Sequence, residues 1–197
     1  MHTINTQWIL IGGIVVVAAW IALAVWFSYR KKQTKKLQDR FGAEYGRTVD
    51  DLGSRTKAES ELKARERRVE SLDIAPLSPA EAARFNVSWT ALQGRFVDDP
   101  RGVVVQADQL VRELMLQRGY PMGDFEHRAA DISVDHPTVV QNYRAAQAIA
   151  VRGATGAAST EEQRNAVVHY RALFDELLEV DETKPKVVPA REIAVHS

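Results

Sequence analysis

Cysteine is missing from this chain of 197 residues. Its absence excludes disulfide bonds, cysteine-ligated zinc, iron–sulfur clusters, thiol catalysis and an anchor attached to a lipid-modified cysteine. The sequence also has no P-loop, no GxGxxG, no GxSxG and no protein-kinase signature, so the common nucleotide-binding and nucleophile motifs are absent. These absences favour a protein that is not an enzyme, and we assign it no catalytic residue and no cofactor.

Charged side chains are absent from residues 1–29, although the whole chain has 26 basic and 26 acidic residues. Within this stretch, residues 8–29 form an apolar run that would be about 33 Å long as a helix, matching a hydrocarbon core of about 30 Å. No basic residue precedes the run and no small-x-small site follows it, which argues against a cleaved signal peptide. We therefore predict a single transmembrane helix over residues 8–29, after a short N-terminal segment over residues 1–7.

Basic residues follow the apolar run directly. Between residues 30 and 40 there are six of them against one acidic residue, Asp39, so the positive-inside rule places the following chain in the cytoplasm and the N-terminus outside the cell membrane. This basic collar is a topology signal and also a candidate contact for anionic lipid headgroups, through Arg30, Lys31, Lys32, Lys35 and Lys36. The rest of the chain is net acidic, which argues against nucleic-acid binding.

Residues 30–75 are predicted to form this collar and a charged helical connector. Apolar residues recur every three or four positions from residue 41 to residue 52, and three glycines predict breaks in the helix: Gly42, Gly46 and Gly53. Further along, apolar residues form a coiled-coil-like seam that covers only about two heptads. A coiled coil needs at least three or four, so this length favours a solvated helix. That seam consists of Ala58, Leu62, Val69 and Leu72.

Residues 76–179 contain the start signals of about five helices. Four of the starts have a polar cap before the first turn: Ser78, Asp99, Asp124 and Ser159. Asp135, which precedes His136 and Pro137, is predicted to open a further helix in the same way. Each helix has an apolar stripe with a period near 3.6, so these stripes can be buried only against one another. The sequence thus predicts an all-α protein with a small helical bundle, followed by a disordered tail over residues 180–197.

The segment DISVDHP is the most site-like stretch of this bundle. Its side chains Asp131, Asp135 and His136 are able to act as acid and base or to ligate a metal, with His127 or His169 as a further ligand. Helix capping by Asp135 explains the same residues with fewer assumptions, and neither extra histidine has HExxH-like spacing, so we assign no metal site. We treat the segment, with two residues of the RGYP turn, as candidate interaction or structural turn residues: Arg118, Tyr120, Asp131, Asp135 and His136.

Several motifs recur in one order between about residue 40 and residue 178: FGAEYGRTVDDLG, RRVESLDI, RFVDDP, ADQLV, RGYP, SVDHP and YRALF. With them the chain resembles a family of uncharacterised bacterial single-pass membrane proteins, often labelled hypothetical or secreted. The resemblance implies a bacterial inner-membrane protein, and it carries no functional residues over to this sequence.

Our leading hypothesis is a membrane-anchored cytoplasmic helical module that binds another protein or a second copy of itself. One alternative is a membrane-anchored metal-dependent hydrolase built on the DISVDHP segment. The other is a regulator that binds anionic lipid through the basic collar.

Overall fold

The computed structural model describes residues 3–180, with side chains described at residue 11 and from residue 16 onward. Within that range the regular elements are eight helices, so the predicted all-α class is confirmed there, and the only other pairing is an isolated bridge between Leu77 and Val180. The chain divides into two compact units, Met1–Leu62 and Lys63–Ser197. The disordered tail predicted after residue 180 lies outside the described residues.

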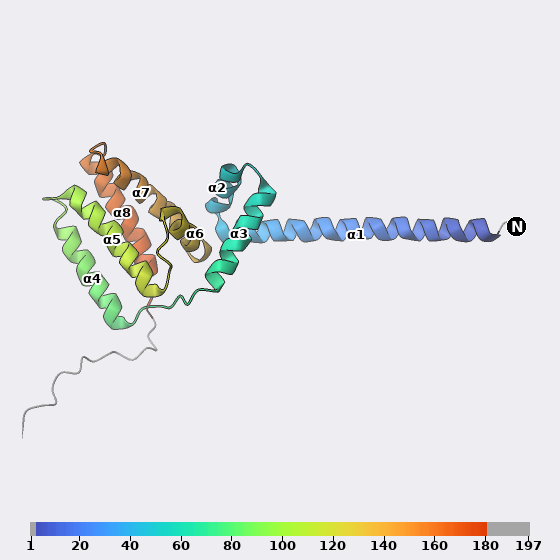
Figure 1. Ribbon diagram of the computed structural model, residues 1–197, viewed down its shortest axis with the longest axis horizontal. Helices are drawn as coiled ribbons and strands as arrows, with labels where there is room; N and C mark the ends of the chain where they lie inside the picture. The colour runs from blue at the N-terminus through green and yellow to red at the C-terminus, as the bar shows by residue number, and fades with distance from the viewer. Residues whose placement is uncertain (1–2, 181–197) are drawn as a thin grey trace, which may run out of the picture. The chain divides into compact units, whose positions relative to one another are not determined.

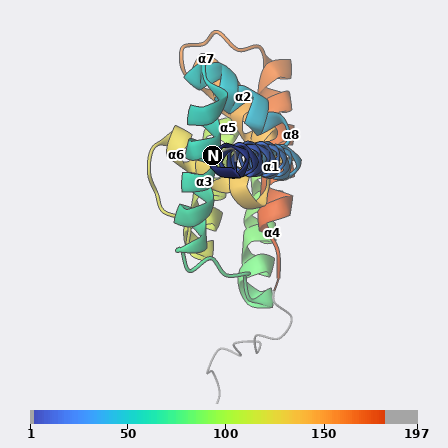
Figure 2. The same ribbon diagram turned by 90° about the vertical axis from the view of Figure 1, so that its right-hand side faces the viewer.

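The first unit begins with α1 (Thr3–Phe41), which does not end where the apolar run ends. It continues through the basic collar as one helix, and Figures 1 and 2 show it without a break, the second nearly end-on. No glycine or proline lies between Gly13 and Gly42, and the collar is rich in lysine, arginine and glutamine, which favour a helix. Gly42, with a φ of 51°, then ends the helix.

Two shorter helices follow α1 in this unit: α2 (Ala43–Leu52) and the first part of α3 (Arg55–Glu70). The predicted breaks occur at Gly42 and Gly53, both with positive φ, whereas Gly46 lies inside α2. The carboxylate of Glu59 on α3 accepts hydrogen bonds from Thr34 Oγ1 at 2.7 Å and from Tyr45 Oη at 3.1 Å. These bonds hold α3 against α1 and α2.

The predicted solvated connector is therefore wrong for part of this segment. The structure buries apolar side chains from all three helices in the first unit, two of them from the predicted seam: Leu37, Phe41, Tyr45, Ala58 and Leu62. Val69 of the same seam is buried as well and belongs to the second unit. A seam of two heptads is too short for a coiled coil between chains. Here it is covered within the chain instead.

The apolar side chains described between residues 16 and 29 are not part of this core. They are exposed on α1, Trp20 to 69% and Val25 to 62%. Within the residues that the structure describes, no helix is long and apolar enough to cross a membrane. The transmembrane helix over residues 8–29 is not supported by this finding and stays a prediction.

The second unit contains the end of α3 and five further helices, in the range where the sequence predicts about five. They are α4 (Pro79–Gly94), α5 (Pro100–Arg118), α6 (Phe125–Asp135), α7 (Val140–Ala154) and α8 (Thr160–Leu177). The helix α8 packs against α5 and α7, while α4 packs on α5 and α6 on α7, as Figure 1 shows. The core includes Trp89, whose ring centroid lies 4.7 Å from that of Phe174.

Four of the five predicted caps are confirmed. Ser78 and Ser159 form complete capping boxes, and the carboxylates of Asp99 and Asp124 accept from the backbone N–H three residues on. Each such cap stabilises its helix by about 1 kcal/mol.

The cap predicted at Asp135 is wrong. Asp135 is the last residue of α6, and α7 begins only at Val140, with Val139 at its N-cap and no side-chain cap. Pro137 explains the difference, because a proline disfavours the helical conformation in the residue before it. His136 accordingly has φ −126° and ψ 56°, which ends α6 instead of starting α7.

Gly119 allows two backbone segments to meet closely at the end of α5. It caps the helix with a φ of 100°, and a Cβ added to it would overlap the carbonyl oxygen of Asp73. Two backbone hydrogen bonds hold the segment between α3 and α4 in place. Ala75 N donates to Arg118 O at the end of α5, at 2.9 Å, and Leu77 N donates to Glu179 O after α8, at 3.0 Å.

We expect Gly119→Ala to lower the free energy of unfolding by about 3 kcal/mol, since it adds a clash with backbone to a left-handed conformation. Gly156→Ala is the matched control, because Gly156 has a φ of 77° but nothing within 4 Å of an added Cβ. It should cost only about 1 kcal/mol. Urea unfolding of the full chain in detergent, followed by circular dichroism, measures both. Equal losses in the two variants would contradict the close approach.

Candidate functional site

The structure brings the five predicted site residues to one end of the bundle. Arg118 ends α5, Tyr120 follows its glycine cap, and Asp131, Asp135 and His136 belong to the last turns of α6 and its C-cap. The phenol of Tyr120 interacts electrostatically with Arg118, Asp131 and Asp135. Two stretches that are distant in the sequence therefore form one polar cluster, which we call the junction cluster.

Asp131 is the most deeply buried carboxylate of this cluster, with 2% of its surface exposed. Its Oδ1 accepts from Nε of Arg68 at 2.8 Å and from Nη2 of the same guanidinium at 2.6 Å. Arg68 lies near the end of α3 and is 38% exposed. A buried carboxylate is tolerated only with a hydrogen-bonded partner of opposite charge, so this pair joins α3 to α6.

Arg118 is itself almost fully buried and uses all three nitrogens of its guanidinium. Nε donates to Ala75 O at 3.3 Å, Nη1 to Leu177 O at 3.1 Å and Nη2 to the Glu179 carboxylate at 3.0 Å. Ala75 lies before α4, Leu177 is the last residue of α8, and Glu179 follows that helix. One side chain thus joins the end of α5 to the segments that enter and leave the five-helix bundle.

Tyr120 is 1% exposed, and its hydroxyl has no hydrogen-bond partner among the described residues. Burial, and next the negative charge of Asp135, raise the pKa of Tyr120 to about 12. The phenol therefore stays protonated at neutral pH. It contributes packing to the junction cluster and does not act as a base there.

His136 lies at the edge of the junction cluster. Its Nδ1 is 3.1 Å from Glu176 Oε1 of α8, and its side chain is 10% exposed. Asp131, Arg118 and Tyr120 are buried, so these three do not form a contact surface for another molecule in this state. The contacts of Asp131 and Arg118 join segments within the second unit.

The histidines proposed as further metal ligands lie elsewhere. His127 contacts Asp124 at 2.9 Å on the exposed first turn of α6, and Nδ1 of His169 lies 2.9 Å from Asn142 Oδ1 between α7 and α8. Within the described part of the chain, no three histidine, aspartate or glutamate side chains are placed to hold a metal ion. The geometry gives the metal-dependent hydrolase no support.

A second polar network lies among α5, α7 and α8, and no pattern in the sequence pointed to it. The hydroxyl of Tyr170 contacts Asp108 Oδ1 at 3.2 Å and Gln147 Oε1 at 3.3 Å, and Asp108 pairs with Arg112 one turn away. Burial raises the pKa of Tyr170, so it stays protonated. Asp108 stands beside an apolar stripe like many surface residues, which is why spacing alone did not single it out.

No family model, no curated protein and no solved structure matches the chain. The site is therefore characterised by its own contacts. The junction cluster uses its charges to hold segments of the second unit together.

We expect Arg68→Met to lower the free energy of unfolding by about 2 kcal/mol, because it leaves the buried Asp131 carboxylate without its cation. Adding Asp131→Asn should recover part of that loss, because the double variant no longer buries a charge at this place. Chemical unfolding of the full chain in detergent measures both single variants and the double variant as a double-mutant cycle.

Arg164→Met is the control for this cycle. Its carboxylate partner is Glu161, and the two side chains are 60% and 68% exposed. The Arg164 guanidinium also lies 5.7 Å from the centroid of the Phe96 ring. An exposed pair contributes about 0–1 kcal/mol. If Arg68→Met proved no more harmful than Arg164→Met, the Arg68–Asp131 pair would not be holding α3 to α6.

Proposed function

We propose that this chain is a single-pass membrane protein that holds a helical bundle at the cytoplasmic face of a bacterial inner membrane. The bundle serves there as a binding module for another protein or for a second copy of the chain. Anchoring raises the effective concentration of such a module toward partners in the same membrane.

The observation that carries the proposal is the construction of α1. Residues 8–29 contain no charge, the helix extends from Thr3 to Phe41, and its large side chains described between residues 16 and 29 are exposed. Residues 16–29 alone are too short to cross a bilayer, but the whole uncharged run has the length that about 30 Å of hydrocarbon requires. Exposed apolar surface of this extent is a mark of an interface or a membrane.

The end of the apolar run has the side chains of a membrane interface. The Arg30 guanidinium lies over the Trp26 ring, 4.3 Å from its centroid, and Tyr29 is 63% exposed. Tryptophan and tyrosine are enriched where hydrocarbon meets headgroups, and arginine keeps its charge in water while its stem lies on apolar surface. These residues support a boundary between hydrocarbon and water near residue 29.

The second unit supports a binding module more than a catalyst. Its buried Asp131 and Arg118 are engaged in ion pairs with Arg68 and Glu179, and several large apolar side chains remain on its surface. These are Val87 on α4, Val105 on α5, Val151 on α7 and Val168 on α8, each at least 58% exposed.

Single cysteines test the anchor and the topology, because the chain has no cysteine of its own. In intact spheroplasts, a membrane-impermeant maleimide should label Asn5→Cys, whereas Ala91→Cys in α4 should be labelled only after lysis. Both variants should stay in the membrane pellet after alkaline carbonate extraction. Labelling of Ala91→Cys in intact cells would overturn the orientation, and release by carbonate would overturn the transmembrane anchor.

A photo-crosslinking amino acid at the exposed valines tests the binding module. The amino acid is placed at Val87, Val105, Val151 or Val168, one position at a time, in cells. It should give discrete adducts from the positions on one helix and few from the positions on the other helices, because a specific partner covers one patch. Gel electrophoresis followed by mass spectrometry detects the adducts and shows whether they contain a second copy. Equal, diffuse labelling from all four positions would contradict a specific partner.

A further inference from the structure

The basic collar has two different sides in the structure. On one side Thr34 is bound to Glu59, and Leu37 and Phe41 are 2% and 0% exposed, so this side packs within the first unit. Residues three, four and seven apart share a helix face, which places these three residues on one stripe. With about 100° between successive residues, the four lysines of the collar span roughly 140° of arc, with Lys32 directly opposite this stripe and Lys31 at its flank.

Four exposed lysines lie on this arc, which we call the lysine face: Lys31, Lys32, Lys35 and Lys36. None of them makes an ion pair or a hydrogen bond with the described residues. Arg30, by contrast, is stacked on Trp26. Asp39 is the one acidic residue nearby, and it lines an open hollow together with Lys32, Lys35, Lys36 and Arg40.

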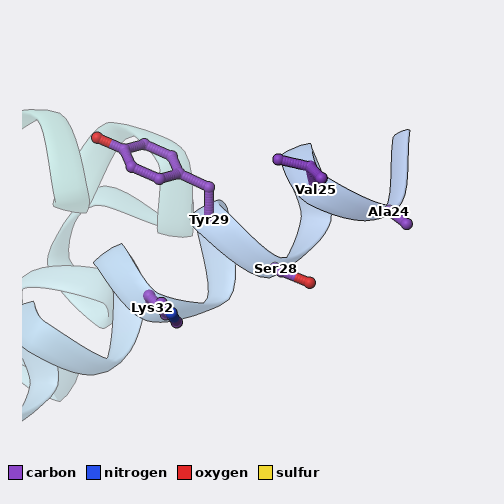
Figure 3. A pocket seen from close by; sticks show the side chains of 5 residues that line it. All are labelled: Ala24, Val25, Ser28, Tyr29 and Lys32. Carbon is purple, nitrogen blue, oxygen red and sulfur yellow. The ribbon is translucent and has the colours of Figure 1, made fainter. Parts of the chain in front are cut away.

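The lysine face begins where the apolar run ends. A hollow of about 320 Å³ lies on α1 at this boundary. Figure 3 shows the side chains that line it, the apolar Ala24 and Val25, then Ser28, Tyr29 and Lys32. At about 1.5 Å per residue, Lys36 lies only about 10 Å along the axis from Tyr29. The headgroup layer on each side of a bilayer is about 5–8 Å deep, and lysine stems reach back toward it.

We propose that the lysine face binds the headgroups of anionic phospholipids in the adjoining leaflet, on the side of α1 away from α2 and α3. The inference rests on the proposed membrane anchor and deepens it by naming a partner. A topology signal requires only net positive charge near the span, whereas four unpaired ammonium groups on one side form a surface for phosphate. Lysine acts here as a hydrated point charge, so the recognition depends on charge and not on a particular headgroup shape.

Quenching of Trp26 by brominated lipids tests the proposal on the full chain. Trp8→Phe and Trp20→Phe leave Trp26 as the only tryptophan of the apolar run, while the buried Trp89 in the bundle adds a constant background. The chain is reconstituted in vesicles of phosphatidylcholine and phosphatidylglycerol, with one or the other brominated. We expect phosphatidylglycerol to be enriched around Trp26 by about threefold or more at low salt, falling toward onefold at about 0.5 M salt.

Changing all four lysines to glutamine should remove this enrichment while the protein stays in the membrane. The matched control removes four positive charges from α3 and should keep the enrichment: Arg55, Lys57, Lys63 and Arg67 to glutamine. Enrichment that survives the loss of the lysine face, or that disappears equally in the control, would overturn the proposal. If neither brominated lipid quenched Trp26, the membrane anchor itself would be refuted, a separate result.

Discussion

A buried charged side chain needs a hydrogen-bonded partner, and this constraint determines the packing at one end of the second unit. Asp131 is buried in α6, and its partner comes from α3, far earlier in the chain. Arg118 is buried at the end of α5, and its acceptors come from the segment before α4, from the last residue of α8 and from the segment after α8. Because leaving such groups unpaired costs several kcal/mol, the segments that carry the partners are held to the bundle. The compact unit accordingly begins at Lys63, before the first bundle helix.

Much of the helical framework could be predicted from local sequence, because its signals act over a few residues. A serine followed three positions later by glutamate satisfies the amides of a helix start wherever it occurs, and both such boxes are present. The apolar stripes likewise predicted that the helices bury one face against each other, and the structure places Trp89 and Tyr170 in their shared core. Pro137 shows the limit of this reasoning, since the same residue type that begins some helices here ends α6.

The junction cluster could be predicted only in part, and the reason is distance along the chain. The sequence singled out Arg118 and Tyr120 in the RGYP turn and Asp131 in the DISVDHP segment, and the structure places them together. It did not single out Arg68, which is one of several arginines in a charged run and is distinguished only by its contact with a residue 63 positions later. The first unit was missed for the same reason, because the bonds from Thr34 and Tyr45 to Glu59 link three separate helices.

The continuity of α1 has a mechanical consequence. A helix without a break between its apolar run and Phe41 is stiff. The direction in which each side chain points around its axis is therefore fixed relative to every other side chain of the helix. A tilt or rotation of the apolar part would therefore swing Leu37 and Phe41, and the lysines opposite them, through the same angle. Gly42 is the first place where the polypeptide could absorb such a twist.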